Sequence, residues 1–258
     1  DIEYVGIASP GAIDPVNGVV VYANNLPFVK LPIADILKSF IPVKKVLVEN
    51  DANAAAKGEA VAGAAKGVAD AVMITLGTGV GGGIIIDHKV YAGFNYAGAE
   101  LGHIVIEHNG RQCSCGRRGC WEAYSSATGL INMTKEKLDE CKEKGIPTLM
   151  TKLVEEEGKV SGKTAFAAMK QGDAPAKEVV DMYISYLGCG LSNIINIFQP
   201  EILVIGGGIC NEKHYLTDPL EVIIKQETYG NEAIKPTTLK IAELGNDAGI
   251  IGAAVLGL

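Results

Sequence analysis

One histidine and three cysteines lie close together near the middle of the chain: His103, Cys113, Cys115 and Cys120. Imidazole nitrogen and thiolate sulfur are the ligands that zinc takes in tetrahedral sites, and a site closed by four protein ligands is structural rather than catalytic. The alternative is that these cysteines form disulfides or are simple core residues. Their spacing favours a structural Zn²⁺ site.

Two glutamates flank this cysteine-rich segment. Glu100 comes three residues before His103, and Glu122 comes two residues after Cys120. The same metal ion would therefore hold both carboxylates in place. A rigid loop that presents carboxylates suits the recognition of a ligand rich in hydroxyl groups, because each oxygen accepts hydrogen bonds.

A third carboxylate, Asp51, lies where a predicted strand over 43–49 gives way to an alanine-rich predicted helix over 52–65. In open α/β sheets, groups that contact ligands lie at the carboxyl ends of strands. The alternative is that Asn50 or Asp51 serves only as the N-cap of the helix, which needs no chemistry. The local sequence leaves both interpretations open.

Two glycine-rich segments offer unhindered backbone N–H groups. The first is Gly77–Gly83, and the Thr78 hydroxyl between its glycines favours a loop that wraps phosphate oxygens over a plain hairpin turn. The second, Gly206–Gly208, follows a predicted strand and suits an adenine or ribose lying against the backbone, although strand-to-helix turns also use glycine. A third segment, 158–164, has one residue too few between its glycines for a P-loop and follows no strand.

The elements that must position these residues alternate between strands and helices, which predicts an α/β fold. Short apolar runs and helical periodicity place them as follows. Strands are expected over 4–8, 18–22, 43–49, 71–75, 84–87 and 201–205, and helices over 52–65, 123–129, 133–144, 163–171, 174–198 and 247–256.

Composition narrows the class of protein. The chain has 258 residues, 48% of them hydrophobic, which is enough to bury a large core in two domains. A formal net charge of -7 without any basic run argues against nucleic acid as a partner. No signal peptide or membrane span is evident, and Cys141, Cys189 and Cys210 are expected to be free thiols. These features predict a reduced, soluble, cytoplasmic protein.

Taken together, the motifs resemble those of the ROK family (repressors, uncharacterised reading frames and sugar kinases), and most of all its bacterial glucokinases. The resemblance spans nearly the whole chain in family order. It rests on Ser9-Pro10-Gly11, Asn25-Leu26, Glu49 to Asn53, Leu76 to Gly83, Glu100 to His103, Cys113 to Glu122 and Ile205 to Gly208.

The resemblance implies the actin-like ATPase fold, in which two RNase H-like α/β domains enclose a cleft. We expect one domain over residues 1–66 and 246–258 and the larger one, with the zinc loop, over 67–245. Family members begin with a strand and a D-x-G-G-T phosphate turn, whereas this chain opens at Asp1 in a later strand. We therefore expect a truncated first domain with an exposed sheet edge, and with unknown activity of its own.

The resemblance also implies roles for individual residues. Asp51 would be the general base that takes the proton from the sugar hydroxyl. The sugar would be held by Gly11, Asn25, Asn50, Glu100, His103 and Glu122, with His103 also a zinc ligand. ATP would bind together with Mg²⁺. Its phosphates would contact Gly77, Thr78, Gly79 and Gly81, and its adenosine would contact Gly206, Gly207 and Gly208.

The implied activity is ATP-dependent phosphorylation of a hexose at its 6-hydroxyl, with glucose favoured. Kinases of fructose, mannose, N-acetylglucosamine and N-acetylmannosamine share these residues, and discrimination of roughly 1–3 kcal/mol depends on pocket shape. Two other classes remain open: a sugar-sensing ROK transcriptional repressor with a DNA-binding domain upstream, and a non-catalytic sugar-binding module. The intact Asp51 and phosphate loop favour a kinase. The family resemblance also suggests a homodimer or homotetramer.

Overall fold

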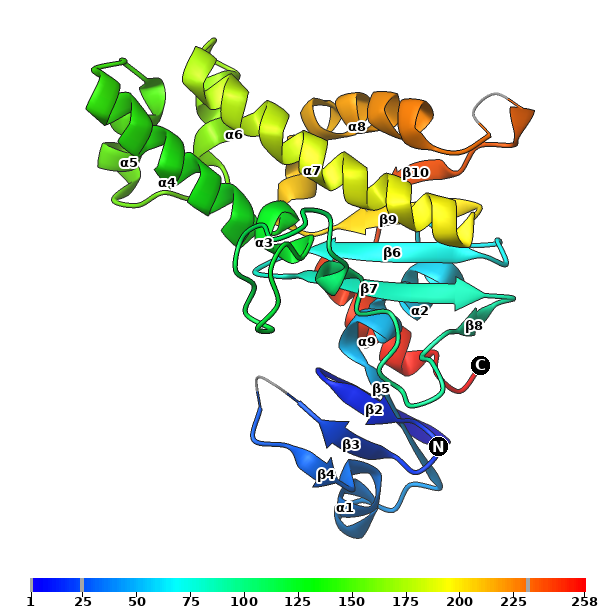
Figure 1. Cartoon of the computed structure of the whole chain (residues 1–258). Coiled ribbons are helices and arrows are strands. Elements are labelled where there is room, and N and C mark those ends of the chain that lie inside the picture. The colour runs from blue at the N-terminus through cyan, green and yellow to red at the C-terminus, as the bar shows by residue number, and fades with distance from the viewer. Residues whose placement is uncertain (1, 24–25, 231–232) are drawn as a thin grey trace.

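A computed structural model describes residues 2–23, 26–230 and 233–258, which fold as a mixed α/β protein (Figure 1). Within this part of the chain, no helix is long and apolar enough to cross a membrane. The strands are β1 (Tyr4–Ser9), β2 (Ala12–Asp14), β3 (Val19–Tyr22), β4 (Val29–Leu31), β5 (Lys45–Asn50), β6 (Ala71–Leu76), β7 (Val80–Ile86), β8 (Lys89–Val90), β9 (Ile202–Gly206) and β10 (Thr238–Ile241). The helices are α1 (Ile33–Phe40), α2 (Asp51–Ala62), α3 (Glu122–Ser125), α4 (Ala127–Lys144), α5 (Leu149–Glu157), α6 (Thr164–Met169), α7 (Ala174–Phe198), α8 (His214–Glu227) and α9 (Ala248–Ala254), with 3-10 turns η1 (Leu101–His103), η2 (Gly208–Glu212) and η4 (Gly245–Asp247).

The largest sheet has five strands in the order β10-β9-β6-β7-β8 and carries apolar residues on both faces. Strand β6 is parallel to β9 and antiparallel to β7. Successive side chains of a strand point to opposite faces. Ile74 and Leu76 of β6 accordingly pack in the cluster that includes Leu187 of α7, whereas Met73 packs in the cluster that includes Ala56 of α2. Helices therefore cover both faces of this sheet, as Figure 1 shows.

Glycines in β7 let α2 approach the sheet closely. A Cβ added to Gly83 would lie 2.5 Å from Cβ of Ala56 and 2.7 Å from the carbonyl oxygen of Ala52, both in α2. The sequence predicted a glycine loop over 77–83 with a strand only from Ile84. That boundary is wrong: β7 begins at Val80, because its glycines serve helix-to-sheet packing as well as the turn.

The N-terminal region contains two smaller sheets (Figure 1). Strand β1 pairs with β5 in parallel, and β3 pairs with β2 and β4 in an antiparallel sheet. A small core that includes Ile13, Val20 and Val48 joins them. The predicted strand over 18–22 therefore exists as β3, in a sheet separate from β1.

Helices α2 and α9 pack tightly on each other between the N-terminal region and the five-stranded sheet (Figure 1). A Cβ added to Gly252 of α9 would lie 1.7 Å from the carbonyl oxygen of Ala54 in α2. One added to Gly6 of β1 would lie 1.8 Å from the carbonyl oxygen of Ala253. At these glycines backbone packs directly against backbone, which holds α2 in a fixed position between the two regions.

Candidate active site

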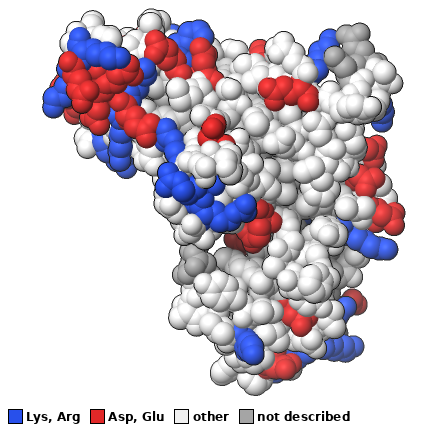
Figure 2. All heavy atoms as spheres, viewed as in Figure 1, with Lys and Arg blue, Asp and Glu red and all other residues white. Residues whose placement is uncertain are grey.

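A cavity of about 1060 Å³ opens between the start of α2, the β6–β7 turn and the cysteine-rich segment. Figure 2 shows acidic side chains inside the hollow on this face of the molecule and basic ones along its upper rim. The structure brings most of the predicted site residues to this one cavity. Its lining includes Gly11, Asn50, Asp51, Gly77, Thr78, Gly79, Gly81, Glu100, His103, Glu122, Gly206 and Gly207.

Among the residues predicted to bind sugar or ATP, Asn25 and Gly208 are not in this set. Asn25 lies outside the residues that the structure describes. Gly208 is not among the described residues that line the cavity, because it begins the turn η2 just beyond Gly207. The adenosine role of Gly208 stays a prediction.

The start of α2 is held by its own backbone and by Asn50. The Asn50 side chain accepts hydrogen bonds from the N–H groups of Ala52, at 2.9 Å, and Asn53, at 3.1 Å. Its amide nitrogen also donates to the carbonyl oxygen of Gly11, at 3.0 Å. Asn50 is therefore the N-cap, as one interpretation of the sequence proposed, and it also ties α2 to the turn after β1.

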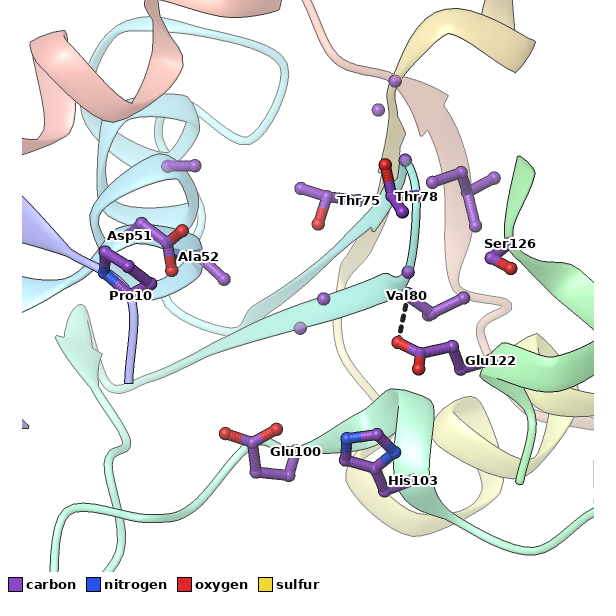
Figure 3. Close-up of a pocket in the computed structure, with 18 of the residues that line it drawn as sticks. Pro10, Asp51, Ala52, Thr75, Thr78, Val80, Glu100, His103, Glu122 and Ser126 are labelled. Atoms are coloured by element: carbon purple, nitrogen blue, oxygen red, sulfur yellow. Dashed lines mark hydrogen bonds between the residues drawn. The ribbon is translucent and has the colours of Figure 1, made fainter. Parts of the chain in front are cut away.

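Because Asn50 caps the helix, Asp51 becomes its first residue and its carboxylate is exposed. One carboxylate oxygen accepts from the N–H of Ala52 at 2.9 Å. Figure 3 shows Asp51 on the same side of the cavity as Pro10, facing Glu100 and His103.

Two buried polar residues to which the sequence analysis assigned no individual role support the start of α2. Glu49 accepts from the backbone N–H of Asn50, at 2.9 Å, and from the side-chain amide of Asn53, at 3.0 Å. Both side chains are buried, and the side-chain oxygen of Asn53 has no partner among the described residues.

The four predicted metal ligands converge. The ligand atoms of His103, Cys113, Cys115 and Cys120 all lie within 4.8 Å of one another. The sulfurs of Cys115 and Cys120 are 3.6 Å apart, and Nδ1 of His103 is 3.7 Å from the sulfur of Cys113. A tetrahedral zinc with Zn–S of about 2.3 Å and Zn–N of about 2.0 Å requires edges of roughly 3.6–3.8 Å. The cluster therefore has the donor set and spacing that zinc needs.

The surroundings shift the pKa values of two of the cysteine ligands in opposite directions. Burial raises the pKa of the Cys120 thiol to about 12, whereas the backbone N–H of Arg117 lowers that of Cys115. Zinc binds thiolate, not thiol, so a thiolate at Cys120 needs a neighbouring positive charge. The guanidinium of Arg117 meanwhile donates to the carbonyl oxygen of His103 at 2.9 Å, which fixes the backbone of the one histidine ligand.

Because Nδ1 of His103 faces the cysteines, the other ring nitrogen is free to face the cavity. His103 ends the turn η1, and Glu100 directly precedes that turn. Figure 3 shows the two side chains next to each other below β7. Gly102 allows this turn to lie against the strand, because a Cβ there would be 2.2 Å from the carbonyl oxygen of Val80.

Glu122 connects the cysteine-rich segment to the β6–β7 turn. One of its carboxylate oxygens accepts from the backbone N–H of Val80 at 3.0 Å, as Figure 3 shows. The other accepts from the hydroxyl of Ser114 at 3.3 Å. A Cβ added to Gly79 would lie 2.3 Å from the Glu122 carboxylate. The glycine thus makes room for a carboxylate that the metal loop brings in.

The turn between β6 and β7 presents backbone groups to the cavity. Gly77 and Thr78 are exposed and Gly79 is half-buried. The N–H of Gly77 donates to the carbonyl oxygen of Gly79 at 3.0 Å, which closes a tight turn. Consecutive N–H groups in such a turn form a concave site for anions.

The far wall of the cavity includes residues that the sequence did not single out. They come from the start of α4 and from the segment before α9, and include Ser126, Thr128, Asn132, Gly245, Asn246 and Gly249. Arg111 and Glu136 also line it and form an ion pair at 2.5 Å, with the Arg111 guanidinium over the ring of Tyr124. The bounds of the helix predicted over 123–129 are wrong, because α3 ends at Ser125 and α4 begins at Ala127 after its N-cap Ser126.

The fold and cavity define a small-molecule-binding α/β protein in which carboxylates face a glycine-rich turn suited to anions. Comparison with known proteins makes this more specific. A model of the ROK family matches residues 1–258, and the chain belongs to that family. Its fold is the actin-like ATPase fold of the ROK sugar kinases.

Individual relatives agree with this assignment. A glucokinase of Thermotoga maritima is 41% identical over 256 residues, which cover 98% of this chain and 78% of the relative. The crystal structure of a ROK family glucokinase from Streptomyces griseus in complex with glucose and AMPPNP is 35% identical. It superposes with a TM-score of 0.83 over 99% of this chain and 81% of that one. A xylose repressor of Bacillus spizizenii is 33% identical, over 87% of this chain and 53% of the repressor.

Proposed function

We propose that the protein transfers the γ-phosphoryl group of ATP to the 6-hydroxyl of a hexose, with glucose as its substrate. The observation that carries this proposal is the single cavity that holds the Asp51 carboxylate, the glycine-rich turn and the carboxylates of the metal loop. Phosphoryl transfer needs an anion site and a proton acceptor close together, and this cavity offers both. The likeness to glucokinases, one of them bound to glucose and AMPPNP, supports the choice of substrates.

In this proposal Asp51 is the general base. Its carboxylate accepts the proton of the 6-hydroxyl as that oxygen attacks the γ-phosphorus in line and the bond from phosphorus to the bridging oxygen of ADP breaks. One Asp51 oxygen already accepts from the N–H of Ala52, so the other is left for the sugar. This arrangement fixes the carboxylate without using up its basic oxygen.

The other hydroxyls of the sugar would be bound by groups from both sides of the cavity. On the metal-loop side these are Glu100, Glu122 and the free ring nitrogen of His103. On the α2 side they are Asn50 and the backbone at Gly11, which Asn50 holds in place at 3.0 Å. Acceptors and donors arranged around a ring of hydroxyls distinguish a sugar from other alcohols by their directions.

ATP would be bound by its phosphates at the 77–79 turn and by its adenosine between Gly206–Gly207 and the segment 245–249. Mg²⁺ would enter with ATP and neutralise charge on its phosphates, and the carboxylate and hydroxyl oxygens exposed in the cavity are ligands of the kind it takes. A structural Zn²⁺ held by His103, Cys113, Cys115 and Cys120 would stiffen the loop that carries Glu122.

We also propose that residues 1–66 with 246–258 and residues 67–245 form the two domains that enclose this cavity. Helices α2 and α9 both belong to the first of these domains, and they pack on each other where it meets the second. Closure of such a cleft on the sugar would exclude water, which would otherwise compete as the phosphoryl acceptor.

The likeness to xylose repressors leaves sugar sensing as the second candidate, since the same body could bind a sugar without transferring phosphate. The exposed Asp51 carboxylate and the turn with free backbone N–H groups favour the kinase, because a sensor needs neither. The two functions make different demands on Asp51, so one substitution can separate them.

The test is ATP-dependent phosphorylation of a panel of hexoses and N-acetylhexosamines by the protein from its complete reading frame, with Asp51→Asn as the matched variant. We expect glucose to be preferred and the variant to lose about 10²–10⁴-fold in kcat while it still binds glucose. Binding of sugar without turnover of any of them would contradict the kinase and support the sensor. A different preferred sugar would correct the substrate alone.

A further inference from the structure

The start of α4 makes two hydrogen bonds to the β6–β7 turn. The backbone N–H of Ala127 donates to the carbonyl oxygen of Gly77 at 2.8 Å. The hydroxyl of Thr128 donates to the carbonyl oxygen of Thr78, also at 2.8 Å. No sequence motif marks Thr128, and it belongs to none of the groups assigned above to sugar, phosphate or metal.

These bonds fix the directions of the peptide groups in the turn. In a trans peptide, the carbonyl oxygen and the following N–H point in opposite directions. The Gly77 and Thr78 carbonyls both point at α4, so the N–H groups of Thr78 and Gly79 point away from it. The carbonyl oxygen of Gly79 accepts from Gly77, and the next N–H, that of Val80, accordingly points at Glu122.

Two N–H groups of the turn are therefore left for a ligand. Those of Thr78 and Gly79 have no hydrogen-bond acceptor among the described residues, whereas those of Gly77 and Val80 do. Adjacent N–H groups that point the same way form a nest for an anionic oxygen. The nest depends on Thr128, because the Thr78–Gly79 peptide has no other bond to hold its carbonyl oxygen in place.

We propose that Thr128 is a positioning residue for phosphoryl transfer: its hydroxyl holds the Thr78–Gly79 peptide so that the Thr78 and Gly79 N–H groups bind the phosphates of ATP. This inference rests on the proposed kinase function. Its consequence is specific to one substrate, since the peptide lies on the phosphate side of the cavity and the sugar-binding groups belong to other segments. Loss of the hydroxyl lets the peptide rotate and turns one N–H away from the phosphates.

The test compares Thr128→Val, which removes the hydroxyl and keeps the shape, with Thr128→Ser, which keeps the hydroxyl. Thr134→Val is the matched control, because Thr134 lies on the same helix and donates to the carbonyl oxygen of Leu130 at 2.7 Å, but is not among the residues that line the cavity. The measurements, on the complete protein, are Kd for AMPPNP with Mg²⁺, Kd for glucose, and kcat and KM for ATP.

We expect Thr128→Val to weaken AMPPNP binding and lower kcat/KM for ATP by about tenfold, the effect of losing one well-placed hydrogen bond at a charged ligand. Glucose Kd should stay within about twofold, and Thr128→Ser should restore most of the loss. The inference is overturned if Thr128→Val and Thr134→Val bind AMPPNP alike, or if glucose affinity falls as much as nucleotide affinity. Absence of sugar phosphorylation by the unsubstituted protein would overturn the proposed function instead, and the AMPPNP comparison would still decide the role of Thr128.

Discussion

The two sides of the cavity hold their carboxylates in place by different physical means. Asp51 stands at the start of α2, where its direction follows from the helix and from the Asn50 cap next to it. Glu122 lies at the end of the cysteine-rich segment. It accepts a hydrogen bond from the N–H of Val80, which belongs to a strand far away in the sequence. One carboxylate is placed by local structure and the other by long-range contacts.

The long-range side is anchored at several points. Cys120 and Trp121 are fully buried, and the Trp121 indole N–H donates to the carbonyl oxygen of Tyr186 in α7 at 3.1 Å. Gly190 of α7 makes room for the indole, since a Cβ there would lie 2.0 Å from the ring. The metal ligands fix one end of the segment and this tryptophan fixes the other. Glu122 follows directly.

The two carboxylates therefore suit different roles, proton transfer for Asp51 and sugar binding for Glu122. A general base needs only one well-placed oxygen, and the first residue of a capped helix can supply it. A carboxylate that binds sugar hydroxyls needs both of its oxygens in fixed positions. A loop held by a metal ion fixes them better than a flexible loop does. If so, damage to the metal loop should affect sugar affinity, and damage to the start of α2 should affect stability.

The largest effect expected on sugar binding comes from removing the metal. In Cys120→Ala we expect zinc content to fall to background and glucose Kd to rise about 10–100-fold, because Glu122 and His103 lose their support. AMPPNP Kd should change by no more than about twofold, since α4 still holds the β6–β7 turn. Metal analysis and calorimetric titration with each ligand measure these changes.

Cys141→Ala is the matched control for that experiment. Cys141 is also buried and free, but it lies on α4 outside the four-ligand cluster. It should keep its zinc and its glucose affinity while losing some stability from the smaller side chain. Full glucose affinity in Cys120→Ala after loss of the metal would contradict the proposal that the metal loop positions Glu122 and His103 for sugar binding.

The opposite side is tested by Asn50→Ala. Loss of an N-cap costs about 1–2 kcal/mol, and here the bond to the carbonyl oxygen of Gly11 is lost as well. We expect the free energy of unfolding in urea to fall by about that amount, with zinc content unchanged. Asn50→Asp keeps the acceptor for Ala52 and Asn53 but cannot donate to Gly11. Equal destabilisation by both variants would show that the Gly11 bond, and not the cap, holds the start of α2.

The same contrast explains what the sequence could predict. Asn50, Asp51 and the ligand set from His103 to Cys120 were found from local spacing, and the structure brings them together as expected. Helix α7 was predicted with its observed bounds, because Asp173 caps it, Pro175 fits its first turn and an apolar stripe runs along it. The family, and with it the fold, followed from motifs of this local kind.

The errors arose where distant segments meet. The glycines of β7 were assigned to a loop because only the structure reveals the α2 backbone packed against them. The helices expected from the sequence do not include α8, and Pro219 in its interior argues against a helix when only the local sequence is considered. Thr128 escaped notice for the same reason, as its partner Thr78 is 50 positions away. Helix α5 had local signals, an N-cap at Thr148 and a left-handed glycine at Gly158, that the prediction did not use.

The smallest expected effect concerns α4, which carries the wall of the nucleotide side and packs on α7. Lys137 of α4 donates to Glu140 at 2.5 Å and to Glu178 of α7 at 2.8 Å. These carboxylates raise the pKa of Lys137, and the bonds from Lys137 and Lys144 lower the pKa of Glu140 to about 2. Because these are surface ion pairs, we expect Lys137→Met to lower Tm at pH 7 by only about 2 °C, with zinc content and both ligand affinities unchanged.

The two pKa shifts determine the pH range in which this difference in Tm is present. The lowered pKa of Glu140 means that its contribution is present above the ordinary value of 4.5 and is lost as the pH falls toward 2. The raised pKa of Lys137 means that its contribution is present below the ordinary value of 10.5 and is lost as the pH rises beyond it. Thermal melts should therefore show a constant difference in Tm between the variant and the parent from about pH 5 to 10, narrowing on either side. Lys152→Met, which removes a looser pair with Glu156 at 3.8 Å, should show less difference at every pH. A gap that persists unchanged at pH 3 would mean that Lys137 stabilises α4 through the packing of its methylene chain and not through its charge.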